Sequence, residues 1–175
     1  MFFHVSLEAK IKMHPSDLGP KLNNAIKRKL QLQEEGRCTP EFGFVVAVIE
    51  TKVIAKGMVS DAGNGLVSFP VKYEAVVFKP FKNEVLDTRV TAVNKMGFFA
   101  EAGPLQVFVS SHLIPEDHSF TLAEEPCYQS DDGQSRIRVN SEVRLRIIGS
   151  RVDPGKIFCI GTIKDDYTGL VRDAV

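Results

Sequence analysis

The break at Lys79-Pro80-Phe81-Lys82 is the feature that most limits how this chain can fold. It separates two runs rich in β-branched residues. Pro80 cannot donate to a sheet ladder, and it restricts Lys79 to extended geometry. A new sheet is therefore expected after it. Residues 97–103 alternate between apolar and mixed positions, and Gly103-Pro104 predicts a turn. We expect two small domains, residues 1–80 and 81–175.

The first half has the pattern of a small α+β layer. A strand is predicted from Phe2 to Met13, and a helix after Pro20 whose apolar stripe is Leu22, Ile26 and Leu30. Three further strands are expected over residues 42–49, 52–60 and 66–78. The last two flank a turn that contains Gly63 and Gly65, where glycine permits positive φ.

The second half predicts a five-stranded barrel. Alternating patterns run through residues 97–103, 105–110, 136–147 and 157–162, and a helical turn is expected at Ser111–Ile114. Five strands with a short helix between the third and fourth are the order of an OB fold. The acidic segment from Glu116 to Asp132 is expected to be a loop.

Charge and composition favour an ordinary soluble protein with a masked basic surface. The chain has 175 residues, is 43% hydrophobic and carries no net charge. Residues 116–132 hold six acids and no Lys or Arg, so the rest of the second half is basic. No membrane span or signal peptide is evident, which predicts an intracellular protein. Cys38, Cys127 and Cys159 indicate neither disulfides nor a zinc site.

One outward face of the barrel is the candidate binding surface. If Phe98, Val107, Val109, Val143 and Leu145 fill the interior, alternation turns four other side chains outward: Phe99, Phe108, Arg144 and Arg146. Exposed aromatic rings stack on bases, and arginines can hold phosphates. The alternatives are that an aromatic ring packs beneath the acidic segment and that the arginines form a solvated face.

An enzyme is the rival class of function, and the sequence gives it little support. Asp131-Asp132 and Asp165-Asp166 lack a histidine or third acid at ligand spacing, so no metal site is expected. Gly63-x-Gly65 is followed by a strand rather than a helix, so no dinucleotide fingerprint and no cofactor are expected. A free-standing RNA-binding factor would share the barrel but would not need the first half.

Several long strings resemble the family of the seventh subunit of eukaryotic RNA polymerase II. They are FPVKYEAVVFKPFK at residues 69–82, NKMGFFAEAGP at 94–104, IGSRVD at 148–153 and IFCIGTIKDDY at 157–167, with His14-Pro15 and Gly19 near the start. The resemblance covers essentially the whole chain. The related stalk subunits of polymerase III, the plant RNA-silencing polymerases and the archaeal polymerases share this plan.

The resemblance implies a non-catalytic stalk subunit with a truncated ribonucleoprotein-like first domain and an OB barrel. Its implied partners are the helical subunit four, the polymerase core with its largest subunit, and single-stranded nascent RNA in the nucleus. The core-docking tip would comprise His14, Pro15, Gly19, Gly57, Gly63 and Gly65. RNA would meet Phe99, Phe108, Arg144, Arg146, Arg151 and Lys156.

Overall fold

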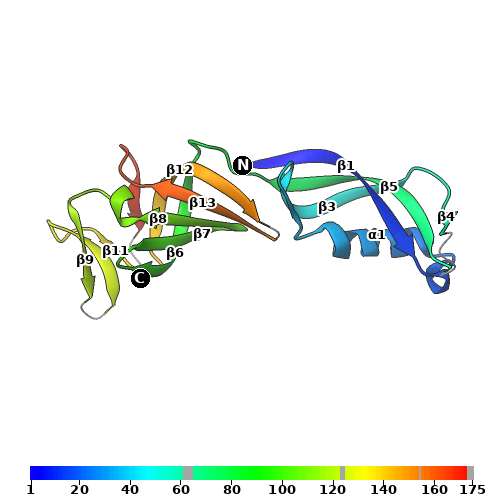
Figure 1. Cartoon of the computed structure of the whole chain (residues 1–175), viewed down its shortest axis with the longest axis horizontal. Helices are drawn as coiled ribbons and strands as arrows, with labels where there is room; N and C mark the ends of the chain where they lie inside the picture. The colour runs from blue at the N-terminus through cyan, green and yellow to red at the C-terminus, as the bar shows by residue number, and fades with distance from the viewer. Residues whose placement is uncertain (61–64, 123–124, 154, 173–175) are drawn as a thin grey trace. The chain divides into compact units, whose positions relative to one another are not determined.

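A computed structural model describes residues 1–60, 65–122, 125–153 and 155–172. The chain divides into two compact units, Met1–Lys79 and Pro80–Val175, which meet at the proline break (Figure 1). Each unit has a hydrophobic interior of its own. The units are therefore described one at a time.

The first unit is an antiparallel sheet with one helix. Its elements are β1 (Phe2–Met13), the 3-10 turn η1 (Pro15–Asp17), α1 (Leu22–Glu34), β2 (Cys38–Thr39), β3 (Gly43–Val53), β4 (Met58–Val59) and β5 (Val67–Phe78). The strand order is β1-β5-β3-β2, and β4 pairs with β5. β1 and β5 pair along their whole length, from Phe2 opposite Phe78 to Met13 opposite Val67.

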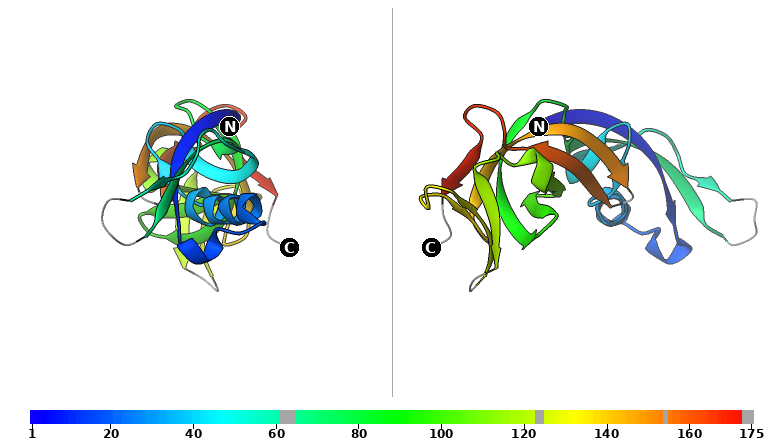
Figure 2. Two further views of the ribbon diagram at one scale, coloured as in Figure 1. Left: turned by 90° about the vertical axis from the view of Figure 1, so that its right-hand side faces the viewer. Right: turned by 60° about the vertical axis from the view of Figure 1, so that its left-hand side comes forward.

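Helix α1 lies along one face of this sheet (Figures 1 and 2). Ile26 and Leu30 of the predicted apolar stripe are fully buried against the sheet, which confirms the helix and its orientation. The last turn is tied down by Glu34, which is itself buried and accepts a hydrogen bond from the Tyr73 hydroxyl at 3.3 Å. Burial and the nearby Glu34 carboxylate raise the pKa of Tyr73 to about 12.

The second unit is a closed five-stranded barrel. Its strands are β6 (Val85–Asn94), β7 (Gly97–Ala102), β8 (Leu105–Ser110), β12 (Glu142–Asp153) and β13 (Lys156–Thr162). The order is β13-β8-β7-β6-β12, and pairing of β12 with β13 closes the ring. The 3-10 turn η2 (Ser111–Leu113) lies between the third and fourth strands, and β14 (Gly169–Arg172) extends the sheet beside β12. The predicted OB order is confirmed.

The prediction of a loop over Glu116–Asp132 was wrong. Most of this segment forms β9 (His118–Leu122) and β10 (Pro126–Ser130), and with β11 (Arg136–Ile137) they make a separate three-stranded sheet. Residues 136–137 therefore belong to this small sheet and not to the barrel.

Two aromatic side chains explain why the acidic segment folds into strands. Phe120 and Tyr128 contact each other edge to face, with ring centroids 5.6 Å apart. Tyr128 is buried, and its hydroxyl donates to the carbonyl of Asn94 at 2.9 Å. The described acids Glu116, Asp117, Glu125, Asp131 and Asp132 are exposed. The contact of the half-buried Phe120 ring with the buried Tyr128 ring thus stabilises the strands, while the acidic side chains stay on the surface.

Candidate functional site

A pair of aromatic rings lies on the outer face of the barrel. Phe99 on β7 stands opposite Phe108 on β8, and their ring centroids are 4.9 Å apart at 42°. Both side chains are half-buried. Their inward neighbours Phe98, Val107 and Val109 have no exposed area. The predicted assignment of faces is confirmed.

Two residues of β13 lengthen this apolar surface. β13 runs parallel to β8, with Ile160 opposite Phe108 and Phe158 opposite Gln106. Ile160 is 51% exposed, whereas the alternate residues of β13 point into the barrel. Phe99, Phe108, Phe158 and Ile160 form what we call the barrel row. Sequence reasoning missed the β13 residues, although their alternation with buried Ile157 and Cys159 carried the signal.

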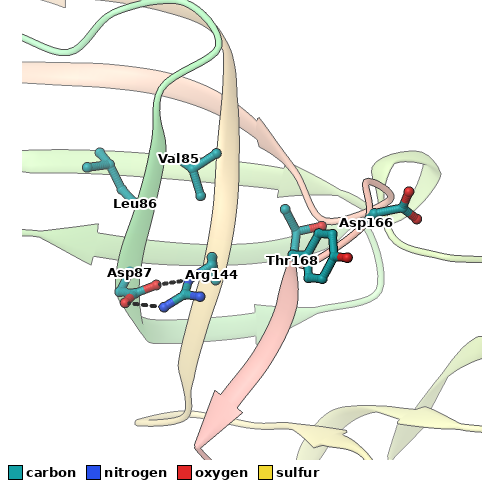
Figure 3. Close-up of a pocket in the computed structure, with 7 residues that line it drawn as sticks. Val85, Leu86, Asp87, Arg144, Asp166 and Thr168 are labelled. Atoms are coloured by element: carbon teal, nitrogen blue, oxygen red, sulfur yellow. Dashed lines mark hydrogen bonds and ion pairs between the residues drawn. The ribbon is translucent and has the colours of Figure 1, made fainter.

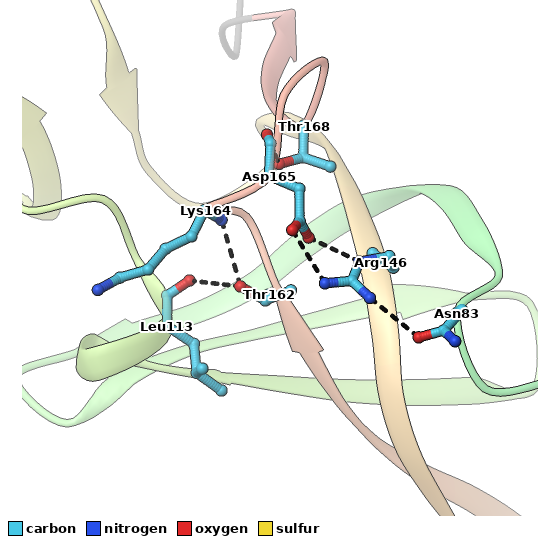
Figure 4. Close-up of polar contacts among 7 residues, drawn as sticks. All are labelled: Asn83, Leu113, Arg146, Thr162, Lys164, Asp165 and Thr168. Atoms are coloured by element: carbon cyan, nitrogen blue, oxygen red, sulfur yellow. Dashed lines mark hydrogen bonds and ion pairs between the residues drawn. The ribbon is translucent and has the colours of Figure 1, made fainter.

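Arg144 and Arg146 point outward as predicted, but each is held by acidic side chains. Arg144 donates two hydrogen bonds to Asp87, at 2.6 and 2.9 Å (Figure 3). Arg146 donates to both carboxylate oxygens of Asp165, at 2.7 and 2.9 Å, and to Asn83 at 2.9 Å (Figure 4). A phosphate would have to compete with these bidentate partners.

These hydrogen bonds shift the pKa values of the two carboxyl groups. The bonds from Arg144 lower the pKa of Asp87, and the bonds from Arg146 lower the pKa of Asp165. A lowered carboxyl pKa means that each pair is fully formed above the ordinary carboxyl pKa and is lost as the pH falls through the lowered value. Both arginines are therefore paired at neutral pH.

Strand pairing separates these arginines from Phe99, although Arg146 stands opposite Thr162, two residues after Ile160 of the barrel row. On β6, Arg144 stands opposite Asp87, whereas Phe99 stands opposite Ala92. Five residues of extended strand span about 16 Å. The structure therefore does not bring the predicted aromatic and arginine residues into one cluster.

Arg151 and Lys156 are placed differently, at the hairpin between β12 and β13. Arg151 stands opposite Phe158, and its side chain is 83% exposed with one hydrogen bond of 3.2 Å to Asp153. Lys156 is exposed two residues before Phe158. These two cations adjoin the β13 end of the barrel row.

The predicted tip residues gather at one end of the first unit. His14 caps η1, and its Nδ1 lies 2.9 Å from the Ser16 hydroxyl. Gly65 has φ of 65°, and a Cβ there would come within 3.4 Å of Pro15. The corner after β1 and the start of β5 are thus neighbours, while Gly63 lies outside the described residues.

This tip has an apolar surface. Met58 and Val59 of β4 are 66% and 67% exposed, and Leu18 is also exposed. Gly57 is needed for packing, because a Cβ there would lie 2.6 Å from the Phe69 ring. Gly19 is exposed, and a Cβ there would meet no atom. Exposed apolar residues that gather at one end of a domain are typical of a protein contact.

The described residues show neither a metal-binding cluster nor a membrane-spanning helix. Within residues 1–60, 65–122, 125–153 and 155–172, no three His, Cys, Asp or Glu side chains converge on a point that could hold a metal ion. The one α-helix of this described part is too short and too polar to cross a membrane.

Comparison with known proteins decides the family. Residues 8–65 match the SHS2 domain found in the N terminus of Rpb7p/Rpc25p/MJ0397, and residues 79–160 match the S1 RNA binding domain. The RNA polymerase II subunit RPB7 of Glycine max is 54% identical over 99% of this chain and 98% of its own length. The chain belongs to the family of the seventh subunit of RNA polymerase II.

More distant members of the family define its range. The subunit RPB7 of Saccharomyces cerevisiae is 39% identical over 98% of this chain and all of its own length. The RNA polymerase IV subunit 7 of Arabidopsis thaliana is 28% identical over 85% of this chain and 86% of its own length. These alignments span both units of this chain, in which an SHS2 domain is followed by an OB barrel of S1 type.

Proposed function

We propose that this chain is a non-catalytic stalk subunit of nuclear RNA polymerase II that supports initiation of transcription. In this role it pairs with subunit four, docks on the polymerase core through its first unit and contacts single-stranded nascent RNA through its barrel. The observation that carries the proposal is the barrel row, which lies on an S1 domain in a chain 54% identical to a polymerase II subunit.

The apolar tip supports docking on the core. Met58, Val59 and Leu18 leave apolar area in water that a partner could bury, and each Å² buried contributes roughly 25 cal/mol. His14, Pro15, Gly19, Gly57 and Gly65 shape the backbone around these residues and remain the proposed docking set together with Gly63. Contact with the largest subunit of the core is part of the same proposal.

The edges of the first unit support pairing with subunit four. β1 is an edge strand of 12 residues in the described sheet, and it pairs with β5 alone. Long open edges invite pairing with another chain unless they are covered. A helical partner laid along such a surface would cover it.

RNA contact is proposed to be weak, selective for single strands and tolerant of sequence. The rings of Phe99 and Phe108 can stack on any base, and Arg151 and Lys156 can meet phosphates without reading bases. Arg144 and Arg146 remain proposed RNA contacts, although a phosphate would have to displace Asp87 from Arg144 and Asp165 from Arg146. A chain with no net charge gains little from long-range attraction to RNA.

Phe99→Ala is expected to weaken binding of single-stranded RNA about fivefold or more, since stacking contributes roughly 1–3 kcal/mol per base. The melting temperature should change little, because the ring lies outside the barrel interior. Leu122→Ala, which removes an exposed apolar side chain from the small sheet, is the matched control. Gel shifts with oligouridine measure the affinity. Equal oligouridine affinity of the two variants would show that the barrel has a structural role and does not bind RNA through Phe99.

A silencing-polymerase subunit is the second candidate. Its support is the match to the polymerase IV subunit, and its weakness is the lower identity, 28% against 52% for the polymerase II subunit of the same plant. A free-standing RNA-binding factor would require neither the tip nor the open edge. The polymerase recovered with the chain separates the three possibilities.

A further inference from the structure

The turn between β13 and β14 holds one residue, Tyr167, in an unfavourable backbone conformation. The Asp165 carboxylate binds Arg146, while its carbonyl oxygen accepts hydrogen bonds from the Thr168 amide at 3.2 Å and the Thr168 hydroxyl at 2.6 Å (Figure 4). Between these anchors Tyr167 has φ of 66°. This left-handed region disfavours every residue with a Cβ, and bulky side chains most.

The Tyr167 ring does not recover that cost by packing. Tyr167 is 94% exposed, the largest exposed fraction among the large hydrophobic residues that the structure describes. Glycine or asparagine would fit the same turn with less strain. A strained position that holds an aromatic ring in water is a candidate contact for a partner, because backbone strain concentrates at binding sites.

Tyr167 is one of the residues that line a groove of about 570 Å³; Figure 3 labels the other lining residues. Its apolar part is Val85 and Leu86 of β6, and Val85 is half exposed. Its charged groups are the Asp87–Arg144 pair, which is neutral as a whole, and Asp166. No cation pairs with Asp166 within the part of the chain that the structure describes. The groove is therefore mildly acidic, with an aromatic ring at its side.

We propose that this groove binds a basic peptide segment of another protein. An arginine or lysine would lie on the Tyr167 ring and pair with Asp166, and a neighbouring apolar side chain would cover Val85 and Leu86. Cations over a tyrosine face are attracted by its π electrons. Tyrosine is also among the residues that most often dominate the energetics of protein interfaces.

Three features favour a peptide over nucleic acid at this site. The acidic charge of the groove repels phosphates, and the one arginine in it, Arg144, already donates from Nε and Nη2 to the Asp87 carboxylate. β14, which follows Tyr167, ends the six-stranded sheet among the described strands, and an edge strand offers backbone hydrogen bonds that suit an extended peptide. The groove shares Arg144 with the proposed RNA contacts, but the barrel row lies elsewhere, on β7, β8 and β13.

The test measures peptide and RNA affinity of the same full-length variants. The peptide probe is a short fluorescein-labelled chain of alternating arginine and leucine, with alternating glutamate and leucine as its matched control. Fluorescence anisotropy measures the affinity, and Tyr167→Ala and Asp166→Asn should each lower the affinity for the arginine peptide about fivefold or more. Phe99→Ala should leave this affinity unchanged, and Tyr167→Ala should leave oligouridine affinity unchanged.

Each other outcome overturns the proposal. Equal binding of the arginine peptide to the parent chain and to Tyr167→Ala would show that Tyr167 does not contact the peptide. Weaker oligouridine binding by Tyr167→Ala would show that the groove contacts nucleic acid. Loss of peptide binding on adding polymerase subunit four would show that subunit four covers the groove and leaves no room there for a basic peptide. Tyr167→Asn should keep or raise the melting temperature, because asparagine tolerates positive φ. A fall of several degrees in the melting temperature of Tyr167→Asn would show that the ring stabilises the fold.

Discussion

Replacing Phe98 with alanine is expected to destabilise the barrel by about 3–5 kcal/mol, the usual cost of deleting a buried phenyl ring. Phe98 has no exposed area, and it stands between Val93 on β6 and Val109 on β8. A loss of this size in a unit of about 100 residues should lower the melting temperature by roughly 12 °C or more.

The adjacent residue provides the matched control for this prediction. Phe99→Ala removes the same ring from the outer face and should shift the melting temperature only slightly. Thermal unfolding of both variants followed by circular dichroism tests the assignment. A barrel that tolerates Phe98→Ala but melts early with Phe99→Ala would show that the faces have been assigned the wrong way round.

Two aspartates at the tip should abolish docking on the polymerase core. The double variant Met58→Asp, Val59→Asp places two charges where we propose that a partner buries apolar side chains, and unpaired buried charges cost several kcal/mol. A loss of about 100-fold or more in affinity for the core is expected. Both residues are more than half exposed, so the fold of the first unit should persist.

The control places a charge elsewhere on the same unit. Leu32→Asp alters an exposed residue of α1 and should leave core binding intact. Binding is measured by recovery of purified core on the immobilised chain, and circular dichroism verifies folding. Full recovery with the double tip variant would mean that the chain docks through another surface.

The sequence predicted most of the regular elements, because local signals mark them, but the strand predicted over residues 52–60 was wrong: β3 continues to Val53 and only Met58–Val59 form the short β4. β1 begins and ends at the predicted Phe2 and Met13, since alternation identifies the strand and the following Pro15 favours its end. The OB order followed from alternation and from the short helix after β8. The prediction failed at β9 and β10, where acidic residues hid a sheet that depends on the contact between Phe120 and Tyr128.

The candidate site was predictable only in part, because its partners are distant along the chain. Alternation assigned Phe98 and Phe99 to opposite faces. It could not reveal that Arg144 would meet Asp87, which lies 57 residues earlier, or that Arg146 would meet Asp165. Likewise, alternation marks Ile160 as outward-facing, but its place beside Phe108 depends on the parallel pairing of β13 with β8, which no local pattern specifies.

Purification of the tagged chain from cells that express it, with mass spectrometry of the proteins recovered, is the most direct test of the proposed function. The account predicts recovery of subunit four together with the largest subunit of RNA polymerase II. The double tip variant should retain subunit four and lose the largest subunit. Recovery of the chain alone, or with the largest subunit of a silencing polymerase in place of that of polymerase II, would contradict the account.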